Sequence, residues 1–201
     1  MGVKKAVITA GGLGTRLLPV SKEVPKEMLP LFSLSNGIIG LKPIVHIVFE
    51  CLFSVGIREF CFIVGRSKRV LEDYFTPDVG FVDLLQGRGL GDRAECLKEF
   101  YSMVFRSKMF FINQPYPRGF GDAVLHAEPF VGIEPFILHA GDDVVLSRNC
   151  DHFKRLIKVF EEYNADATVL LEEVEDPRAY GVALGKAVDN YGNVLKLTDI
   201  V

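Results

Sequence analysis

Residues 5–14, KAVITAGGLG, are the stretch that decides the fold. The apolar run at 5–10 lies between lysines and glycines, a pattern that predicts a short buried strand. Three glycines in four positions follow at once, so the backbone there is free to approach a ligand closely and to present N–H groups to phosphate oxygens. Ligands of open α/β sheets bind at the carboxyl ends of strands. The stretch therefore predicts a phosphate-binding loop at the end of the first strand.

Similar apolar runs continue along the chain. They predict strands at residues 59–65, 108–113 and 135–140, and helical patterns occupy residues 43–55, 68–75, 93–105 and 150–163. Pro43 in the first turn and Gly56 just past the end mark the limits of the first helix. Strands that alternate with helices indicate an α/β fold, with a mainly parallel sheet and helices on both faces.

After residue 163 the pattern changes. Residues 166–173, 181–187 and 193–198 are predicted to be strands, with a turn at residues 189–192 that joins the last two into a hairpin. The glycine-rich residues 84–91 are predicted to form a surface connection. With 201 residues and no marked boundary, we expect one domain over residues 1–201.

Composition restricts the partners and the location of the protein. The net charge is −3 and the 23 basic residues are scattered among 26 acidic ones, so we expect no nucleic-acid or membrane surface. No apolar run approaches the length of a membrane span. The cysteines lie in or beside apolar runs without C-x-x-C spacing, which predicts reduced, mostly buried thiols in a cytoplasmic protein: Cys51, Cys61, Cys96 and Cys150.

The spacing after the loop excludes two common phosphate-binding motifs. A dinucleotide fingerprint needs glycine where Leu17 stands, and the Gly-Lys-Ser/Thr of a Walker A motif is absent. Instead, Arg16, Lys22 and Lys26 follow the glycines. Arginine binds phosphate oxygens in a bidentate manner and lysine supplies a compact charge. A plain glycine turn followed by solvated charges is the structural alternative.

A second polar segment follows another predicted strand. Asp142 and Asp143 come directly after residues 135–140. Magnesium takes one or two carboxylates together with substrate phosphates, so this pair is a candidate site for a divalent cation. The alternative is an aspartate pair that only begins a loop.

These segments together resemble a known family. Residues 11–30, GGLGTRLLPVSKEVPKEMLP, resemble the signature of the sugar-1-phosphate nucleotidyltransferases, and PKEMLP is similar to the form in bacterial and archaeal glucose-1-phosphate uridylyltransferases. Further landmarks follow in the family's order: Gln114, GFGDA at 119–123, GDD at 141–143 and AYGV at 179–182. The resemblance implies a Rossmann-like nucleotidyltransferase fold.

The resemblance also implies a role for each matching residue. Backbone groups lining the nucleotide would come from Ala10, Gly11 and Gly12, and residues on the base side would be Glu27, Gln114 and Gly119. Gly181 would lie near the hexose. Arg16 would bind the β and γ phosphates, Lys26 would bridge donor and acceptor phosphates, and Asp142 would hold Mg²⁺.

The implied reaction transfers a uridylyl group from UTP to glucose 1-phosphate and yields UDP-glucose and pyrophosphate. A thymidylyltransferase acting on dTTP, or a non-catalytic nucleotide-binding module, are the alternatives. Relatives usually have Gly-Leu-Gly-His-Ala where this chain has Asp122 as the fourth residue. They also continue into a Glu-Lys-Pro segment and a second metal-binding aspartate, so we expect the C-terminal part of the catalytic domain to be missing. We further expect a homo-oligomer.

Overall fold

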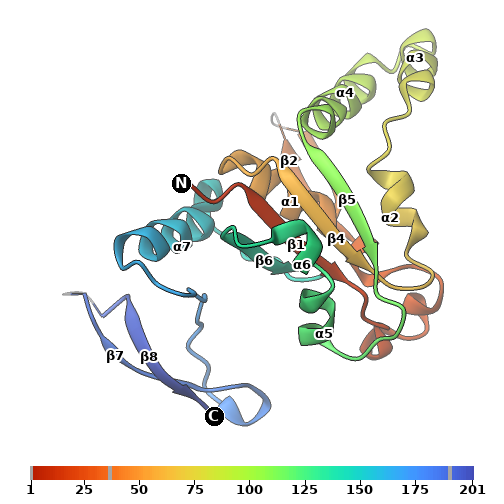
Figure 1. Cartoon of the computed structure of the whole chain (residues 1–201). Coiled ribbons are helices and arrows are strands. Elements are labelled where there is room, and N and C mark those ends of the chain that lie inside the picture. The colour runs from red at the N-terminus through yellow and green to blue at the C-terminus, as the bar shows by residue number, and fades with distance from the viewer. Residues whose placement is uncertain (1, 36–37, 190–191) are drawn as a thin grey trace. The chain divides into compact units, whose positions relative to one another are not determined.

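The computed structural model describes residues 2–35, 38–189 and 192–201. Its central sheet has four strands, β1 (Lys5–Ala10), β4 (Glu59–Val64), β5 (Lys108–Asn113) and β6 (Phe136–Ala140). They are parallel and lie in the order β5-β4-β1-β6 (Figure 1). Ala10 pairs with Val64 and Val64 with Asn113, so the carboxyl ends lie level along one edge. The four predicted strands of the sheet are confirmed.

One face of the sheet is covered by a cluster of aromatic rings. Phe60 and Phe62 of β4 point to this face. Phe49 of α1 (Ile44–Ser54) lies with its ring centroid 4.8 Å from that of Phe60, and Phe75, directly after α2 (Arg69–Tyr74), lies 4.8 Å from Phe62. Phe100 of α4 (Gly91–Phe105) completes the cluster 6.1 Å from Phe49. Offset and edge-to-face contacts of this kind add to the stabilisation from apolar burial.

The opposite face is covered by smaller side chains. Val7, Cys61 and Ile63 pack there against α5 (Phe120–Leu125) and α6 (Glu128–Val131), in a cluster that includes Ala123 and Ala127. The predicted α/β architecture, with helices on both faces of a parallel sheet, is confirmed (Figure 1).

Local signals account for where the helices begin and end. The predicted helix at 43–55 is α1, which ends just before Gly56, a residue at φ 102°. The surface connection predicted at residues 84–91 is confirmed only for residues 88–90. The first half of the range belongs to α3 (Val79–Gly87), because the Asp78 side chain accepts a hydrogen bond from the N–H of Phe81 and Val82 is buried, and α4 begins at Gly91. A capped and anchored helix tolerates a terminal glycine.

Two antiparallel hairpins accompany the sheet. The first, β2 (Pro30–Ser35) with β3 (Ile38–Pro43), has no counterpart among the predicted elements. The second, β7 (Ala183–Ala187) with β8 (Leu195–Ile200), confirms the predicted closing hairpin with its last strand shifted by two residues. The predicted turn at 189–192 lies partly outside the described residues. The strand predicted at 166–173 is wrong, since these described residues pair with no strand.

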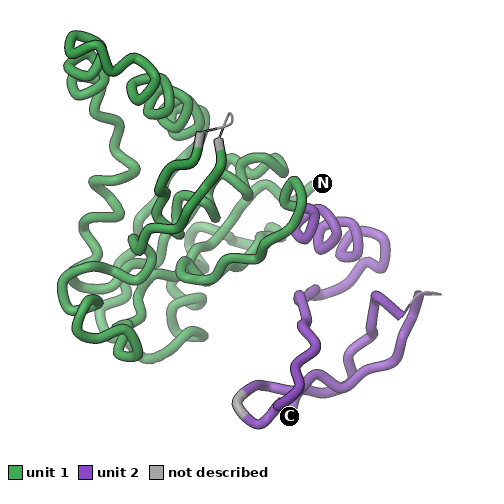
Figure 2. The backbone as a smooth tube through the Cα atoms, turned by 180° about the vertical axis from the view of Figure 1, so that it is seen from behind, with its two compact units in different colours: residues 1–150 green, residues 151–201 purple. Residues whose placement is uncertain are grey.

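The chain forms two compact units (Figure 2). The first, Met1–Cys150, contains the parallel sheet, and the second, Asp151–Val201, contains α7 (Asp151–Glu162), the short helix η5 (Pro177–Ala179) and the β7–β8 hairpin. A single domain over residues 1–201 stays a prediction. Within the described part of the chain, no helix combines the length and the apolar character that crossing a membrane requires.

The cysteines correct one sequence-based expectation. Cys51 of α1 and Cys150, the last residue of η4 (Arg148–Cys150), form a disulfide with their Cα atoms 5.6 Å apart, so the prediction of four reduced thiols is wrong for this pair. Apolar flanks indicate burial, but they do not reveal that two positions separated by 99 residues meet. Cys61 is a buried free thiol whose pKa burial raises to about 12, and Cys96 is exposed.

This arrangement predicts a definite thiol count. The native, unreduced protein should react with a thiol reagent at one site, Cys96, because Cys61 is buried and protonated near neutral pH. Denaturation should expose a second thiol, and denaturation with a reductant all four. Mass spectrometry of the alkylated protein measures each count. Four reactive cysteines after denaturation without reductant would contradict the disulfide.

Candidate functional site

The glycine loop leaves β1 at the level edge of the sheet. Gly14 adopts φ 67°, a left-handed conformation in which a side chain is strained, and its carbonyl accepts a hydrogen bond from Ser21 Oγ at 2.7 Å. Three short 3₁₀ helices follow, η1 (Thr15–Leu17), η2 (Val20–Lys22) and η3 (Lys26–Met28). The loop therefore turns back, and η3 returns to the end of the strand that the chain has just left.

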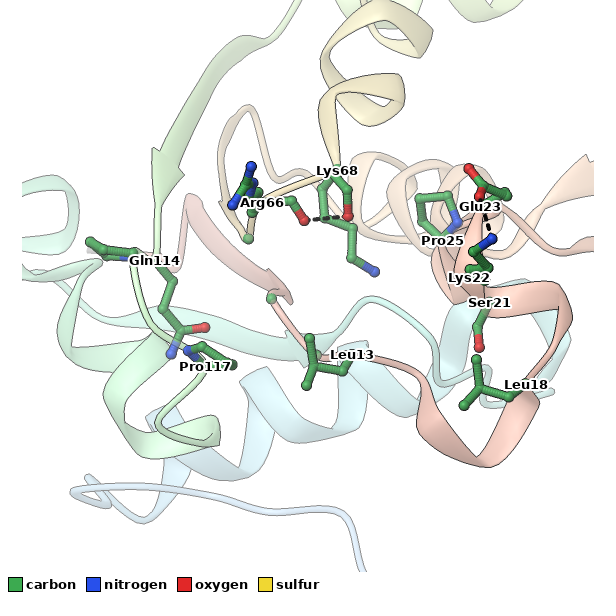
Figure 3. A pocket seen from close by; sticks show the side chains of 15 residues that line it. Leu13, Leu18, Ser21, Lys22, Glu23, Pro25, Arg66, Lys68, Gln114 and Pro117 are labelled. Carbon is green, nitrogen blue, oxygen red and sulfur yellow. Dashed lines mark hydrogen bonds and ion pairs between the residues drawn. The ribbon is translucent and has the colours of Figure 1, made fainter.

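The ends of the neighbouring strands close around this loop. Gly65 follows β4, and a Cβ added there would lie 3.0 Å from the carbonyl oxygen of Gly11. Gln114 follows β5, and its N–H donates to the carbonyl of Val64 at 2.8 Å. A pocket lies between these segments (Figure 3). It is lined by residues 11–13 and 65–68 and by Leu18, Ser21, Lys22, Glu23, Pro25, Gln114, Pro115 and Pro117. The predicted ligand position at the strand ends thus coincides with a pocket.

The structure brings together two of the predicted site residues that are far apart in sequence. Lys26 Nζ lies 2.6 Å from Asp142 Oδ2, with the two side chains 21% and 31% exposed. A Cβ added at Gly12 would lie 3.3 Å from the same Nζ. The ammonium group and the carboxylate therefore lie together beside the glycine loop, although neither residue lines the pocket.

Glu27 makes a second ion pair in another direction. Its Oε2 lies 2.7 Å from Lys68 Nζ, and the side chains are 0% and 9% exposed. Lys68 follows β4 and Asp142 follows β6, the two neighbours of β1. Consecutive residues of η3 are thus tied to both flanking strands, so η3 is fixed across the end of β1. Sequence reasoning missed Lys68, since nothing local marks a lysine as buried.

Gln114 is held by Asp122. The Gln114 side chain is nearly buried, and its Nε2 donates to Asp122 Oδ2 at 2.7 Å and to the carbonyl of Gly119 at 3.2 Å. Gly119, at φ 111°, precedes the first turn of α5. The aspartate that departs from the family pattern therefore contacts a predicted base-binding residue.

The other predicted site residues have varied positions. Ala10 is buried at the end of β1, Gly11 and Gly12 line the pocket, and Glu27 and Gly119 are not among the lining residues. Arg16 lies exposed on η1 and also does not line the pocket. Gly181 belongs to the second unit, where an added Cβ would lie 3.6 Å from Ile200 Cγ2. The ligand contacts inferred for these residues stay predictions.

The acidic segment after β6 is partly exposed. Asp143 is exposed and its N–H donates to the Ala140 carbonyl at 3.3 Å. Burial lowers the pKa of the preceding His139, although the Ala140 carbonyl and the carboxylates of Asp142 and Asp143 act in the opposite direction. Among the described residues, no group of three or more His, Cys, Asp and Glu side chains is arranged to hold a metal.

Comparison with known proteins identifies the family. The model of the family described as nucleotidyl transferase matches residues 5–198. The chain belongs to the nucleotidyl transferase family. A similar family member is UTP–glucose-1-phosphate uridylyltransferase 2 of Streptococcus pyogenes, 38% identical over 190 residues, which cover 92% of this chain and 59% of that protein.

Solved nucleotidyl transferase structures are similar over almost the whole chain. The UTP-bound UDP-glucose pyrophosphorylase of Acinetobacter baumannii superimposes with a TM-score of 0.83 at 28% identity, covering 99% of this chain and 67% of that one. A UDP-glucose pyrophosphorylase complexed with UDP-glucose gives a TM-score of 0.77 at 28% identity, over 99% and 68%. The chain thus spans 59% to 68% of the length of these relatives.

The buried ion pair of Glu27 and Lys68 predicts a measurable effect on stability. Lys68→Met leaves a buried carboxylate without a partner, so it should lower the free energy of unfolding by about 3 to 5 kcal/mol. Urea unfolding near neutral pH, followed by circular dichroism, measures the change. The Glu27→Gln/Lys68→Met double variant removes both charges and should lie much closer to the parent protein. Equal losses in the single and double variants would show that the uncompensated charge is not the cause.

Proposed function

We propose that this protein is a UTP–glucose-1-phosphate uridylyltransferase, whose nucleotide site is the pocket at the ends of β1, β4 and β5. The observation that carries the proposal is the ion pair of Lys26 with Asp142 beside the glycine loop. It unites three separately placed motifs at one strand edge. The substrates are inferred from the similar family member of Streptococcus pyogenes, which is a UTP–glucose-1-phosphate uridylyltransferase.

The donor set at Asp142 suits magnesium. A single partly exposed carboxylate beside an exposed one, without a histidine or cysteine cage in the described residues, fits a metal that keeps several waters and shares substrate phosphates. When bound, magnesium would neutralise phosphate charge and orient the α-phosphate. Asp142 would be its protein ligand. The carboxylate must then exchange part of its contact with Lys26 for the metal.

In the proposed reaction, a phosphate oxygen of glucose 1-phosphate forms a bond to the α-phosphorus of UTP. The bond from that phosphorus to the bridging oxygen breaks, and pyrophosphate leaves with the bonding electrons. The acceptor oxygen is already an anion, so no general base is required. Catalysis of such transfers depends on positioning and on neutralising charge. In this proposal Lys26 contacts the donor and acceptor phosphates, and Arg16 binds the departing pyrophosphate.

Base and sugar recognition complete the proposal. Gln114 would read the base from the end of β5, and Gly11 and Gly12 would offer backbone N–H groups to the phosphates. Gly181 would leave room for the hexose. The residues of the first unit support the proposed binding of UTP. Turnover with glucose 1-phosphate also involves Gly181 of the second unit.

The metal role leads to a paired prediction. Asp142→Asn should weaken magnesium-dependent binding of UTP at least about tenfold, a step of 1.4 kcal/mol, because a neutral amide is a poor ligand for a hard cation. Isothermal titration calorimetry with UTP, with and without magnesium, measures it. Asp143→Asn is the matched control and should bind as the parent does. Small and equal losses of UTP affinity in both variants would show that the two aspartates only begin a loop and do not bind the metal.

The proposed role of Arg16 is tested by comparing two nucleotides. Arg16→Ala should weaken UTP binding about tenfold or more, since a cation that contacts the β and γ phosphates makes charge-assisted hydrogen bonds. Binding of UMP, which lacks those phosphates, should not change. Arg88→Ala, an exposed arginine at the end of α3, is the control. An equal loss of UTP and UMP affinity, or no loss, would remove Arg16 from this role.

A further inference from the structure

Asp122 stands in the first turn of α5, close to the proposed base site. Its side chain is 23% exposed, and Oδ2 accepts the hydrogen bond from Gln114 Nε2 at 2.7 Å. His126, one turn later on the same helix, places Nε2 3.6 Å from that oxygen. None of the contacts of Asp122 in the described structure is to a phosphate-binding residue of the loop. The aspartate therefore acts on the amide of Gln114.

The contacts of Gln114 leave only one orientation for its amide. A primary amide has two N–H donors on nitrogen and only acceptor sites on oxygen. Here Nε2 faces two acceptors, the Asp122 carboxylate and the Gly119 carbonyl. Turning the amide over would direct its oxygen at both of them and would lose two hydrogen bonds, one of them charge-assisted. A carboxylate at position 122 has no hydrogen to donate, so it could not bond to the amide oxygen in the reversed orientation.

The fixed amide presents its oxygen to the pocket. Figure 3 shows the carbonyl oxygen of Gln114 turned towards the glycine loop and its nitrogen turned away. A Cβ added at Gly11 would overlap this oxygen, which places it directly over the backbone of the loop. No described residue donates a hydrogen bond to it. Gln114 Oε1 is therefore a hydrogen-bond acceptor that is available to a ligand in the pocket.

An acceptor at this place discriminates between pyrimidines. Uracil and thymine carry an N3–H donor, whereas N3 of cytosine is an acceptor. Two acceptors that face each other in a site with little water lose hydrogen bonds that both made in solution. The orientation of a single amide is thus sufficient to favour a base with N3–H and to oppose cytosine.

We propose that Asp122 is a specificity-determining positioning residue, which fixes the Gln114 amide so that the pocket offers its carbonyl oxygen to the N3–H of a uracil-type base. This inference rests on the proposed nucleotide site and names the class of base that it takes. Asp122 acts through Gln114 and does not itself touch the nucleotide.

The test compares UTP with CTP, each with magnesium, by calorimetry on the full chain. The parent protein should prefer UTP at least about tenfold. Asp122→Asn keeps the size of the side chain but offers a donor as well as an acceptor, so either orientation of Gln114 becomes possible. We expect the UTP-to-CTP affinity ratio to fall about tenfold, through weaker UTP binding and stronger CTP binding. Asp83→Asn, an exposed position on α3, is the matched control and should leave the ratio unchanged.

A second variant separates positioning from a general effect on the fold. Gln114→Leu should abolish the preference, and adding Asp122→Asn to it should not change the ratio further. The inference is overturned if the Asp122→Asn protein keeps the parent's UTP-to-CTP affinity ratio. It is also overturned if Asp122→Asn changes that ratio equally in the presence and in the absence of Gln114. Neither result would contradict the proposed UTP site. A parent protein that binds UTP and CTP equally also overturns it. If the parent binds neither nucleotide, the proposed function fails as well.

Discussion

The buried ion pair between Glu27 and Lys68 is the interaction on which the site depends. A carboxylate that is fully removed from water is stable as an anion only beside a partner charge. Because Lys68 belongs to the segment after β4, the pair fixes where η3 lies, and the neighbouring Lys26 is thereby directed to Asp142 on the other side of β1. The positions of the other polar groups thus follow from a buried ion pair, of which only the Lys68 side lines the pocket.

The parallel sheet makes this arrangement possible. Each strand ends at the same level, so the residues that follow four strands become neighbours although they are far apart in sequence. The segments after β1 and β6 supply glycines and a carboxylate, and those after β4 and β5 supply a buried cation and an amide. Helix α5 contributes only through Asp122, which orients that amide. The strand ends, the short helix η3 and helix α5 therefore position the polar groups that meet at this edge.

The parts of this structure that were predictable from sequence are those with local causes. The four strands of the sheet, α1 and the glycine loop follow from apolar runs and turn residues, and all three were predicted. The Glu27–Lys68 pair and the Cys51–Cys150 disulfide were not, because each depends on which distant segments meet. Residues 166–173 have a strand-like composition but pair with no strand in the described structure, which shows that composition alone does not form a sheet. Asp122 departs from the family pattern, yet its contact with Gln114 depends on the three-dimensional structure.

The close approach of Gly65 to Gly11 bears on how variation at this site is interpreted. Neither position can accept a side chain without moving its neighbour, since a Cβ at Gly65 would meet the Gly11 carbonyl and a Cβ at Gly11 would meet Gln114. A substitution at either glycine would deform the wall of the pocket and reduce binding through the backbone and Gln114, although neither glycine has a side chain that contacts a ligand. If these glycines are invariant among homologues, the reason is therefore the tight packing of the backbone. A mutational screen for loss of binding would find both positions, but the cause would be steric.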